Sequence, residues 1–173
     1  MKVVWFDAET TGLDPHEGGI LEVAVVVTDL EHLLEPTGPS LSCVLRLEPA
    51  WPMSPFVRDM HTKNGLLGES RESQLMALDV ELALLALVPD VPDKNERPIL
   101  AGSSVHFDRS FLGVWMPTLA ARLSHRAIDT RSIQLFCQSL GMPAIPKQEK
   151  HRAMPDVLEA IDCARKCAAW VVR

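Results

Sequence analysis

Two carboxylates near the N-terminus have a spacing that suits metal chemistry. Asp7 and Glu9 follow an apolar run at residues 3–6, and one residue separates them. Because side chains alternate along a strand, both would point to the same face, where two oxygen ligands suit Mg²⁺ or Mn²⁺. A solvent-facing acidic pair is the simpler explanation. The preceding run is apolar on both faces, however, which predicts a central, buried strand where unpaired carboxylates are costly.

Three further residues of the same chemical kinds stand later in the chain. Asp108 follows a predicted strand and opens a predicted helix, where the helix dipole alone would favour an acid. His151 lies just before the last predicted helix, and Asp156 lies in its first turns. Ordinary capping would explain each residue singly. Together with the first pair, they predict four acids and one imidazole that converge on one site.

The elements that must position these residues begin with strands. Apolar, β-rich runs at 3–6 and 20–28, with glycines between them, predict a hairpin, and 41–47 predicts a third strand. Residues 99–101 and 127–128 are short apolar pieces. The fold class expected is α/β, with a mixed sheet of about five strands, the first three antiparallel, flanked by α-helices. The chain has no repeat or linker, so residues 1–173 are expected to form a single domain.

Helical spacing of apolar residues predicts the remaining elements. The predicted helices are 70–88 with Ser70 as a possible N-cap, 107–123 with a break at Pro117, 129 or 130 to 140, and 154–172. In the first of these helices, the predicted buried face consists of Leu75, Leu78, Leu82 and Leu85. In the last helix, it consists of Val157, Ile161, Ala164, Ala168 and Val171. The proline-rich stretch 49–55 is too broken to predict regular structure.

Composition restricts the function classes. The formal net charge is −6 and no basic stripe is visible, which argues against a processive clamp on long nucleic acid but permits an enzyme for a few nucleotides. No apolar run approaches a membrane span and no secretion signal is visible, so the cytoplasm is the expected location. The four cysteines are expected as free thiols in the core rather than as disulfides or a metal site.

In their order and contexts, the four acids and the histidine resemble the signature of the DEDDh 3′→5′ exonuclease superfamily. Members of this superfamily have a DnaQ-like, RNase H-like fold. The resemblance is closest to the oligoribonucleases and covers most of the chain. The segments that carry it are 3–13, 20–29, 60–66 (MHTKNGL), 101–112 (AGSSVHFDRSFL), 116–117 and 125–129 (HRAID).

The resemblance implies hydrolysis with two divalent ions, Mg²⁺ or Mn²⁺. Asp7 would bridge the two ions. Glu9 and Asp156 would hold the ion near the attacking water, and Asp108 would support the ion near the leaving oxygen. His151 would be the general base. The expected activity is RNA degradation, in which a homodimer releases 5′-mononucleotides from short single-stranded RNA, including dinucleotides.

Further residues would bind substrate if the resemblance extends to the oligoribonuclease pocket. They are Leu13 as a wedge between terminal bases, Phe56 as a stacking face, His61 in the cap segment, Ser104 and Arg126 at the 5′ phosphate, and His125 where the family has a Tyr supplied across the dimer interface. Core packing, a helix end or a surface ion pair is the alternative role for most of them.

The chain also departs from the family pattern. It has no tyrosine, Arg131 stands where the family has Ser, and Thr10-Thr11 after Glu9 is more similar to proofreading exonucleases. These departures keep a DNA-directed DEDDh exonuclease as the main alternative. A haloacid dehalogenase-like phosphatase is a weaker alternative, because it would need Asp two residues after Asp7 and would leave His151 without a role. A catalytically silent nucleic-acid-binding relative is the third.

Overall fold

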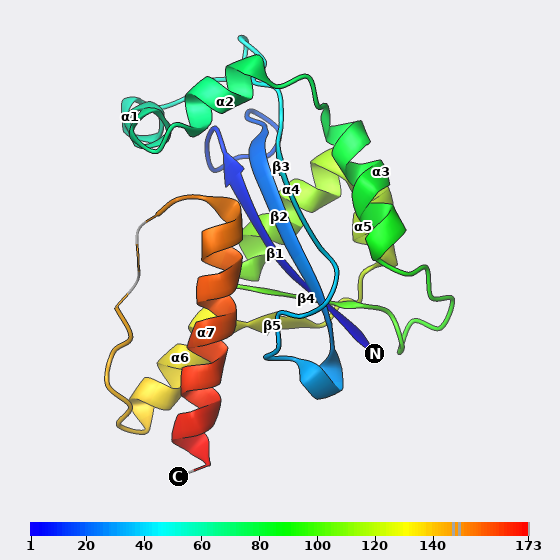
Figure 1. Cartoon of the computed structure of the whole chain (residues 1–173), viewed down its shortest axis with the longest axis vertical. Helices are drawn as coiled ribbons and strands as arrows, with labels where there is room; N and C mark the ends of the chain where they lie inside the picture. The colour runs from blue at the N-terminus through cyan, green and yellow to red at the C-terminus, as the bar shows by residue number, and fades with distance from the viewer. Residues whose placement is uncertain (147, 149, 173) are drawn as a thin grey trace.

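The computed structural model describes residues 1–146, 148 and 150–172. At its centre lies a five-stranded sheet with the order β3-β2-β1-β4-β5 (Figure 1). The first three strands pair antiparallel, whereas β4 and β5 join parallel. This confirms the predicted mixed sheet. The strands are β1 Lys2–Thr10, β2 Ile20–Asp29, β3 Ser40–Val44, β4 Ile99–Gly102 and β5 Ala127–Asp129.

Helices cover both faces of the sheet. Figure 1 shows α7 on one face and α3, α4 and α5 on the other, while α1 and α2 lie beyond the C-terminal end of β1. A single 3-10 turn follows β2 at Leu30–His32. The helices are α1 Pro55–Lys63, α2 Leu66–Glu72, α3 Ala77–Leu87, α4 Val105–Trp115, α5 Pro117–Arg122, α6 Thr130–Ser139 and α7 Ala153–Val171.

The central strand β1 explains why the first acidic motif follows residues that are apolar on both faces. Val4 and Phe6 point into the core under α3, α4 and α5. Val3 and Trp5 point to the opposite face and pack against α7. Since Asp7 and Glu9 continue the odd-numbered series, they lie on the face that α7 covers. The sheet therefore aims both carboxylates towards the start of the last helix.

The prediction of one helix over 70–88 is wrong. The chain forms α2 and α3 with an irregular segment at 73–76 between them. This stretch bonds to the end of β3 and to the segment after it: Arg46 N–H donates to the Leu75 carbonyl at 2.8 Å, and the Ser73 hydroxyl donates to the Val44 carbonyl at 2.7 Å. In a continuous helix the Leu75 carbonyl would accept a hydrogen bond from its own helix instead. Ser70 is inside α2 and is not an N-cap.

The predicted buried face of this segment is also wrong. Leu75, Leu78 and Leu82 are exposed, and Leu85 is only partly buried. The side chains that α3 buries are Val80, Glu81 and Leu84. Glu81 accepts hydrogen bonds from the Thr118 and Leu119 amides at 2.7 and 2.9 Å, which satisfies free N–H groups at the start of α5. The leucines of α3 lie on several sides of the helix, so the sequence pattern alone did not define its buried face.

Other boundaries shift by a few residues. The third strand ends at Val44 instead of continuing to residue 47, and Pro55, at the end of the proline-rich stretch, begins α1 after the capping residue Ser54. The predicted break at Pro117 is confirmed, because α5 begins there. In α7, Ala168 and Val171 are exposed, contrary to prediction.

The cysteine prediction is confirmed in its main point. All four cysteines are free, and Cys137 of α6 and Cys167 of α7 are buried in a small apolar cluster with Met142. Burial raises the pKa of the Cys167 thiol to about 12. The part of the chain that the structure describes contains no helix long and apolar enough to cross a membrane.

Candidate active site

A cavity of about 590 Å³ opens between the end of β1 and the first turns of α4 and α7. β1 supplies two carboxylates from one face, α4 supplies a third from its first turn, and α7 supplies the fourth. The irregular segment before α7 supplies an imidazole. The five predicted catalytic side chains therefore line one cavity: Asp7, Glu9, Asp108, His151 and Asp156.

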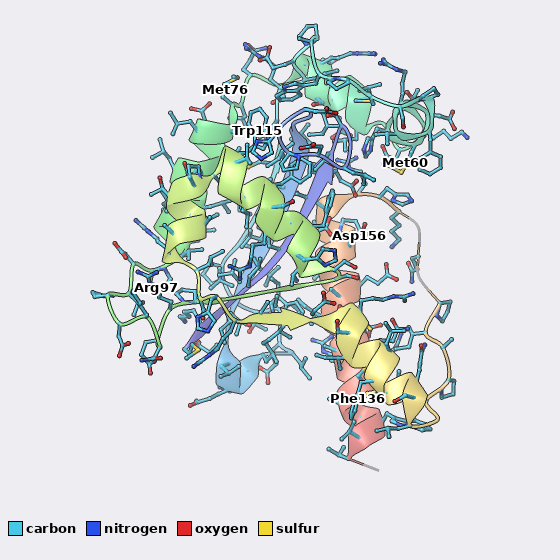
Figure 2. The ribbon with its side chains drawn as sticks, turned by 180° about the vertical axis from the view of Figure 1, so that it is seen from behind. Met60, Met76, Arg97, Trp115, Phe136 and Asp156 are labelled. Carbon is cyan, nitrogen blue, oxygen red and sulfur yellow. The ribbon has the colours of Figure 1, made fainter. Side chains whose placement is uncertain are left out.

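Three of these groups lie close enough together to bind the same metal ion. One ligand atom each from Glu9, His151 and Asp156 lies within 4.8 Å of the other two. Figure 2 shows Asp156 near the start of α7. Because Asp156 is in the first turn of α7, the positive end of the helix dipole also favours negative charge here. The cluster joins a strand near the N-terminus to a helix near the C-terminus.

Asp108 is the most deeply buried of the acids, with 3% of its surface exposed. Its carboxylate accepts a hydrogen bond at 3.1 Å from the amide of Ala8, which lies between the other two acids on β1. Burial raises the pKa of Asp108 well above its usual value, and the nearby negative charge of Asp7 raises it further. A group in this environment gains most from a nearby cation.

The loop that delivers Asp108 is held by another acid. Ser104, directly before α4, has a left-handed backbone with φ 61°, which is uncommon for a residue with a side chain. The Asp129 carboxylate accepts hydrogen bonds from the Ser104 and Val105 amides at 3.3 and 3.2 Å. It also caps α6 through the Arg131 amide. The sequence indicated only a capping role for Asp129, because its contacts with the α4 loop cross 24 residues or more.

The backbone around His151 is held by residues that the sequence analysis did not single out. His151 also has a left-handed backbone, with φ 49°. Asn64 donates to its carbonyl oxygen at 2.6 Å. The next residue, Arg152, pairs with Glu22 of β2 and Glu69 of α2. No local sequence signal links these segments, which are more than 80 residues apart.

Apart from His61, the predicted substrate-binding residues divide into three groups. Ser104 lines the catalytic cavity. Leu13 and Phe56 are apolar side chains that are 86% and 75% exposed, as base-contacting groups need to be. His125 and Arg126 are exposed but are not among the cavity-lining residues.

The structure places His61 beside the end of β1. Its side chain has no exposed surface, and Nε2 lies 3.2 Å from the Thr10 carbonyl oxygen. Nε2 also lies 3.8 Å from Glu9, and burial lowers the pKa of His61, which disfavours its charged form. His61 thus supports the end of β1 in this conformation, and contact with substrate stays a prediction.

Two basic side chains line the other end of the cavity. Arg131 of α6 donates to Gln134, and Lys166 of α7 pairs with Asp162. The acids at one end suit divalent cations, and guanidinium and ammonium groups at the other suit phosphate oxygens. Arg131, noted in the sequence only as a departure from the family, is therefore a component of the site.

The residues present fit divalent metal ions. Their ligand atoms are mostly carboxylate oxygens, which are the donors that Mg²⁺ and Mn²⁺ prefer, and two of these acids, Glu9 and Asp108, are buried. Burial and the nearby charge of Asp7 raise the pKa of Asp108, and a bound cation would offset both effects.

Comparison with known proteins agrees with this geometry. The exonuclease family model matches residues 4–163. The oligoribonuclease of Cutibacterium acnes is 37% identical over 166 residues, which cover 92% of this chain and 81% of that protein. The probable oligoribonuclease of Dictyostelium discoideum is 37% identical over 164 residues, which cover 93% and 85%.

Solved structures show the same fold at low sequence identity. Escherichia coli exonuclease I in complex with a dT13 oligonucleotide has a TM-score of 0.69 and 16% identity, over 95% of this chain and 40% of that chain. The Mg²⁺- and Mn²⁺-bound Pop2p of Schizosaccharomyces pombe has a TM-score of 0.61 and 15% identity, over 94% and 81%. This chain thus spans less than half of exonuclease I. It belongs to the exonuclease family, and within that family it is similar to the oligoribonucleases.

Proposed function

We propose that this protein is a metal-dependent 3′→5′ exoribonuclease that degrades short oligoribonucleotides to 5′-mononucleotides. The observation that carries this proposal is the convergence of four acids and one imidazole in a single cavity. Relatives of 37% identity that bear the name oligoribonuclease support short RNA as the substrate. Membership of the exonuclease family makes the phosphatase alternative wrong.

We propose that the site holds two divalent ions. Asp7 would bridge them, Glu9 and Asp156 would complete the site near the attacking water, and Asp108 would support the second site. When bound, divalent ions supply positive charge that offsets the phosphate and makes the attacking water more acidic. The named structure of Pop2p with Mg²⁺ and Mn²⁺ supports these two metals as candidates.

His151 would act as the general base. Its ring lies beside Glu9 and Asp156, where it can accept the proton of the attacking water. The water oxygen forms a bond to phosphorus while the bond from phosphorus to the 3′ oxygen of the preceding nucleotide breaks. That oxygen then takes a proton from solvent. His151 suits this role better than Mg²⁺ ligation, because Mg²⁺ prefers oxygen donors.

Short substrates would be held by apolar and polar contacts on opposite sides of the phosphate. Leu13 and Phe56 would contact the bases, and Ser104 would contact a phosphate. His125 and Arg126 are proposed to contact the 5′ phosphate from the rim. Neither residue lines the catalytic cavity of the single chain, which agrees with a site that a second subunit completes.

A homodimer is therefore part of the proposal. An exposed apolar stripe at helical spacing consists of Ile133 and Phe136 of α6 and of Leu140 directly after it, opposite the side of this helix that lines the cavity. A second copy could cover the stripe and leave the cavity open. The cytoplasmic location stays a prediction.

A ladder assay tests the activity. RNAs of two to ten nucleotides with a 5′ label are digested with Mg²⁺ or Mn²⁺ and compared with DNAs of the same lengths. The expected result is stepwise loss from the 3′ end, with the fastest hydrolysis on the shortest RNAs. Faster cleavage of the longer DNAs would favour the DNA-directed exonuclease instead.

Calorimetry with Mn²⁺ separates an active enzyme from a silent relative. The wild-type protein should bind Mn²⁺, and Asp7→Ala should lose both binding and activity. If Asp7→Ala bound Mn²⁺ like the wild type, the metal site proposed here would be wrong.

A further inference from the structure

His151, which supplies the imidazole of the site, has a backbone conformation that is unfavourable for histidine. His151 has φ 49°, in the left-handed region, where a residue with a side chain is uncommon and must be held by its surroundings. Residues 150–152 belong to no helix or strand. The direction of the ring therefore depends on contacts that other elements make with this short segment.

Asn64 makes one of these contacts. It ends α1, and its side chain binds in two directions: Nδ2 donates to the His151 carbonyl at 2.6 Å, and Oδ1 accepts from the Leu66 amide at 3.1 Å. Gly65 between them has φ 83°, which a glycine adopts without strain. The turn between α1 and α2 is thereby tied directly to the backbone of His151.

Arg152, the residue after His151, makes the second set of contacts. Its guanidinium donates to both oxygens of Glu22, at 3.0 and 3.1 Å, and to both oxygens of Glu69, at 2.9 and 2.8 Å. Glu22 also accepts from the Ala153 amide at 3.0 Å. Bidentate pairs of this kind fix direction as well as distance. Arg152 thus fastens the start of α7 to β2 and α2.

We call Arg152 and its two carboxylate partners the clamp. Because of the register of the sheet, the clamp also affects the charge beside Glu9. Glu22 is 3% exposed and lies directly opposite Glu9 on the neighbouring strand. Like charges in this arrangement destabilise a sheet. Arg152 offsets the charge of Glu22 and occupies both of its oxygens, which lessens the repulsion between Glu22 and Glu9.

We propose that Asn64 and Arg152 are positioning residues that hold His151 in its catalytic direction. Neither residue lines the cavity, so they would act through His151 and not on the substrate. This inference rests on the proposed function, in which His151 is the base. It also gives the α1–α2 turn a role in the chemistry, because that turn supplies Asn64, which binds the backbone of His151.

Two substitutions at Asn64 separate positioning from helix capping. Asn64→Asp keeps the acceptor for Leu66 but removes the donor to His151, whereas Asn64→Ala removes both. We expect kcat on a dinucleotide to fall about ten-fold or more in both variants, since a positioned base contributes about 10²–10⁴-fold. KM and the Mn²⁺ affinity should stay near the wild-type values. Wild-type kcat in Asn64→Asp with loss only in Asn64→Ala would mean that Asn64 is merely a cap, and would overturn the proposal.

A double-mutant cycle tests whether Asn64 acts through the imidazole. Asn64→Asp in a His151→Ala background should cost nothing further, because the group that it positions is gone. Fully additive losses would overturn the inference and leave the base role standing. If His151→Ala alone kept the wild-type kcat, the proposed function of His151 would fail instead, so the two failures are distinguishable.

Arg152→Lys provides the matching test of the clamp. Lysine keeps the charge, which protects the fold, but cannot make two bidentate pairs as the planar guanidinium does. The kcat should fall in the wild-type background and stay unchanged in the His151→Ala background. Arg46→Lys is the control. Arg46 donates from Nε and Nη2 to one oxygen of Glu48 and does not line the cavity, so this substitution should leave kcat unchanged. Equal kcat in Arg152→Lys and wild type would overturn the role of the clamp.

Discussion

The acids that are buried or half-buried in this chain have two different roles, and their surroundings distinguish them. Glu22, Glu81 and the half-buried Asp129 accept several hydrogen bonds each, so their charges are satisfied by the fold. Asp108 is buried beside other acids, and its pKa is raised. A residue with unfavourable surroundings in the folded protein is a better candidate for a metal ligand than one that the protein already neutralises.

The raised pKa of Asp108 predicts how the metal-free protein responds to pH. The folded state binds the Asp108 proton more tightly than the unfolded state, whose pKa is near the usual 3.8. Stability is therefore lost as pH rises from that value through the raised pKa. Asp108→Asn keeps the acceptor for Ala8 without the charge. In EDTA at pH 7 its Tm should exceed that of the wild type, although activity is lost.

Thermal melts in EDTA from pH 4 to 8 check this prediction. The difference in Tm between Asp108→Asn and the wild type should grow as pH rises, and saturating Mn²⁺ should raise the Tm of the wild type more than that of Asp108→Asn. A lower Tm for Asp108→Asn at pH 7 would contradict the account of Asp108 as an uncompensated charge.

Asp129 should respond to the same substitution in the opposite direction. Both of its oxygens accept backbone N–H groups, so the amide of Asn would place a donor against the Val105 or Ser104 amide. We expect Asp129→Asn to lower the free energy of unfolding by about 1–3 kcal/mol. Urea denaturation measures this. Activity should fall as well, because the same bonds hold the left-handed residue before the helix of Asp108. Unchanged stability would show that Asp129 does not hold this loop.

At the scale of elements, the sequence predicted the strands and the last helices better than the middle of the chain. β1 was recognisable because an apolar run precedes Asp7 and Glu9. α7 was recognisable because apolar residues at helical spacing follow Asp156. The 73–76 break was not recognisable, because it depends on hydrogen bonds to Arg46 and other residues after β3. For the same reason Leu82 was predicted to be buried although it is exposed: only the position of α5 decides which face of α3 is buried.

The elements that rise beyond the end of β1 should control substrate affinity more than chemistry. Leu13, in the loop after β1, and Phe56, in the first turn of α1, expose their apolar side chains. Stacking contributes about 1–3 kcal/mol per base, so Phe56→Ala should raise KM for a dinucleotide about ten-fold with little change in kcat. Steady-state kinetics of Phe56→Ala and Leu13→Ala measure this. A loss confined to kcat would mean that these residues do not contact the bases and instead support the structure of the site.

At the scale of the whole molecule, the site exists only because distant segments meet. The sequence identified Asp7, Glu9, Asp108, His151 and Asp156 through a resemblance, and the topology explains how they converge: the central strand ends beside the starts of α4 and α7. The same folding produces what could not be foreseen. The left-handed backbone of His151 follows from its contacts with Asn64 and from the clamp of Arg152, which no single segment encodes.

The assembly is the remaining property of the whole molecule, and α6 offers the surface for it. Phe136 is 63% exposed and lies on α6, at the opposite end of the molecule from α1 and α2 (Figure 2). We expect Phe136→Glu to convert a dimer to a monomer in sedimentation velocity, because a charge buried without a partner in an interface is strongly unfavourable. Leu82→Glu, which alters the exposed apolar face of α3, is the matched control and should stay dimeric. If Leu82→Glu dissociated and Phe136→Glu did not, the interface would be on α3, on the opposite face of the sheet from α7.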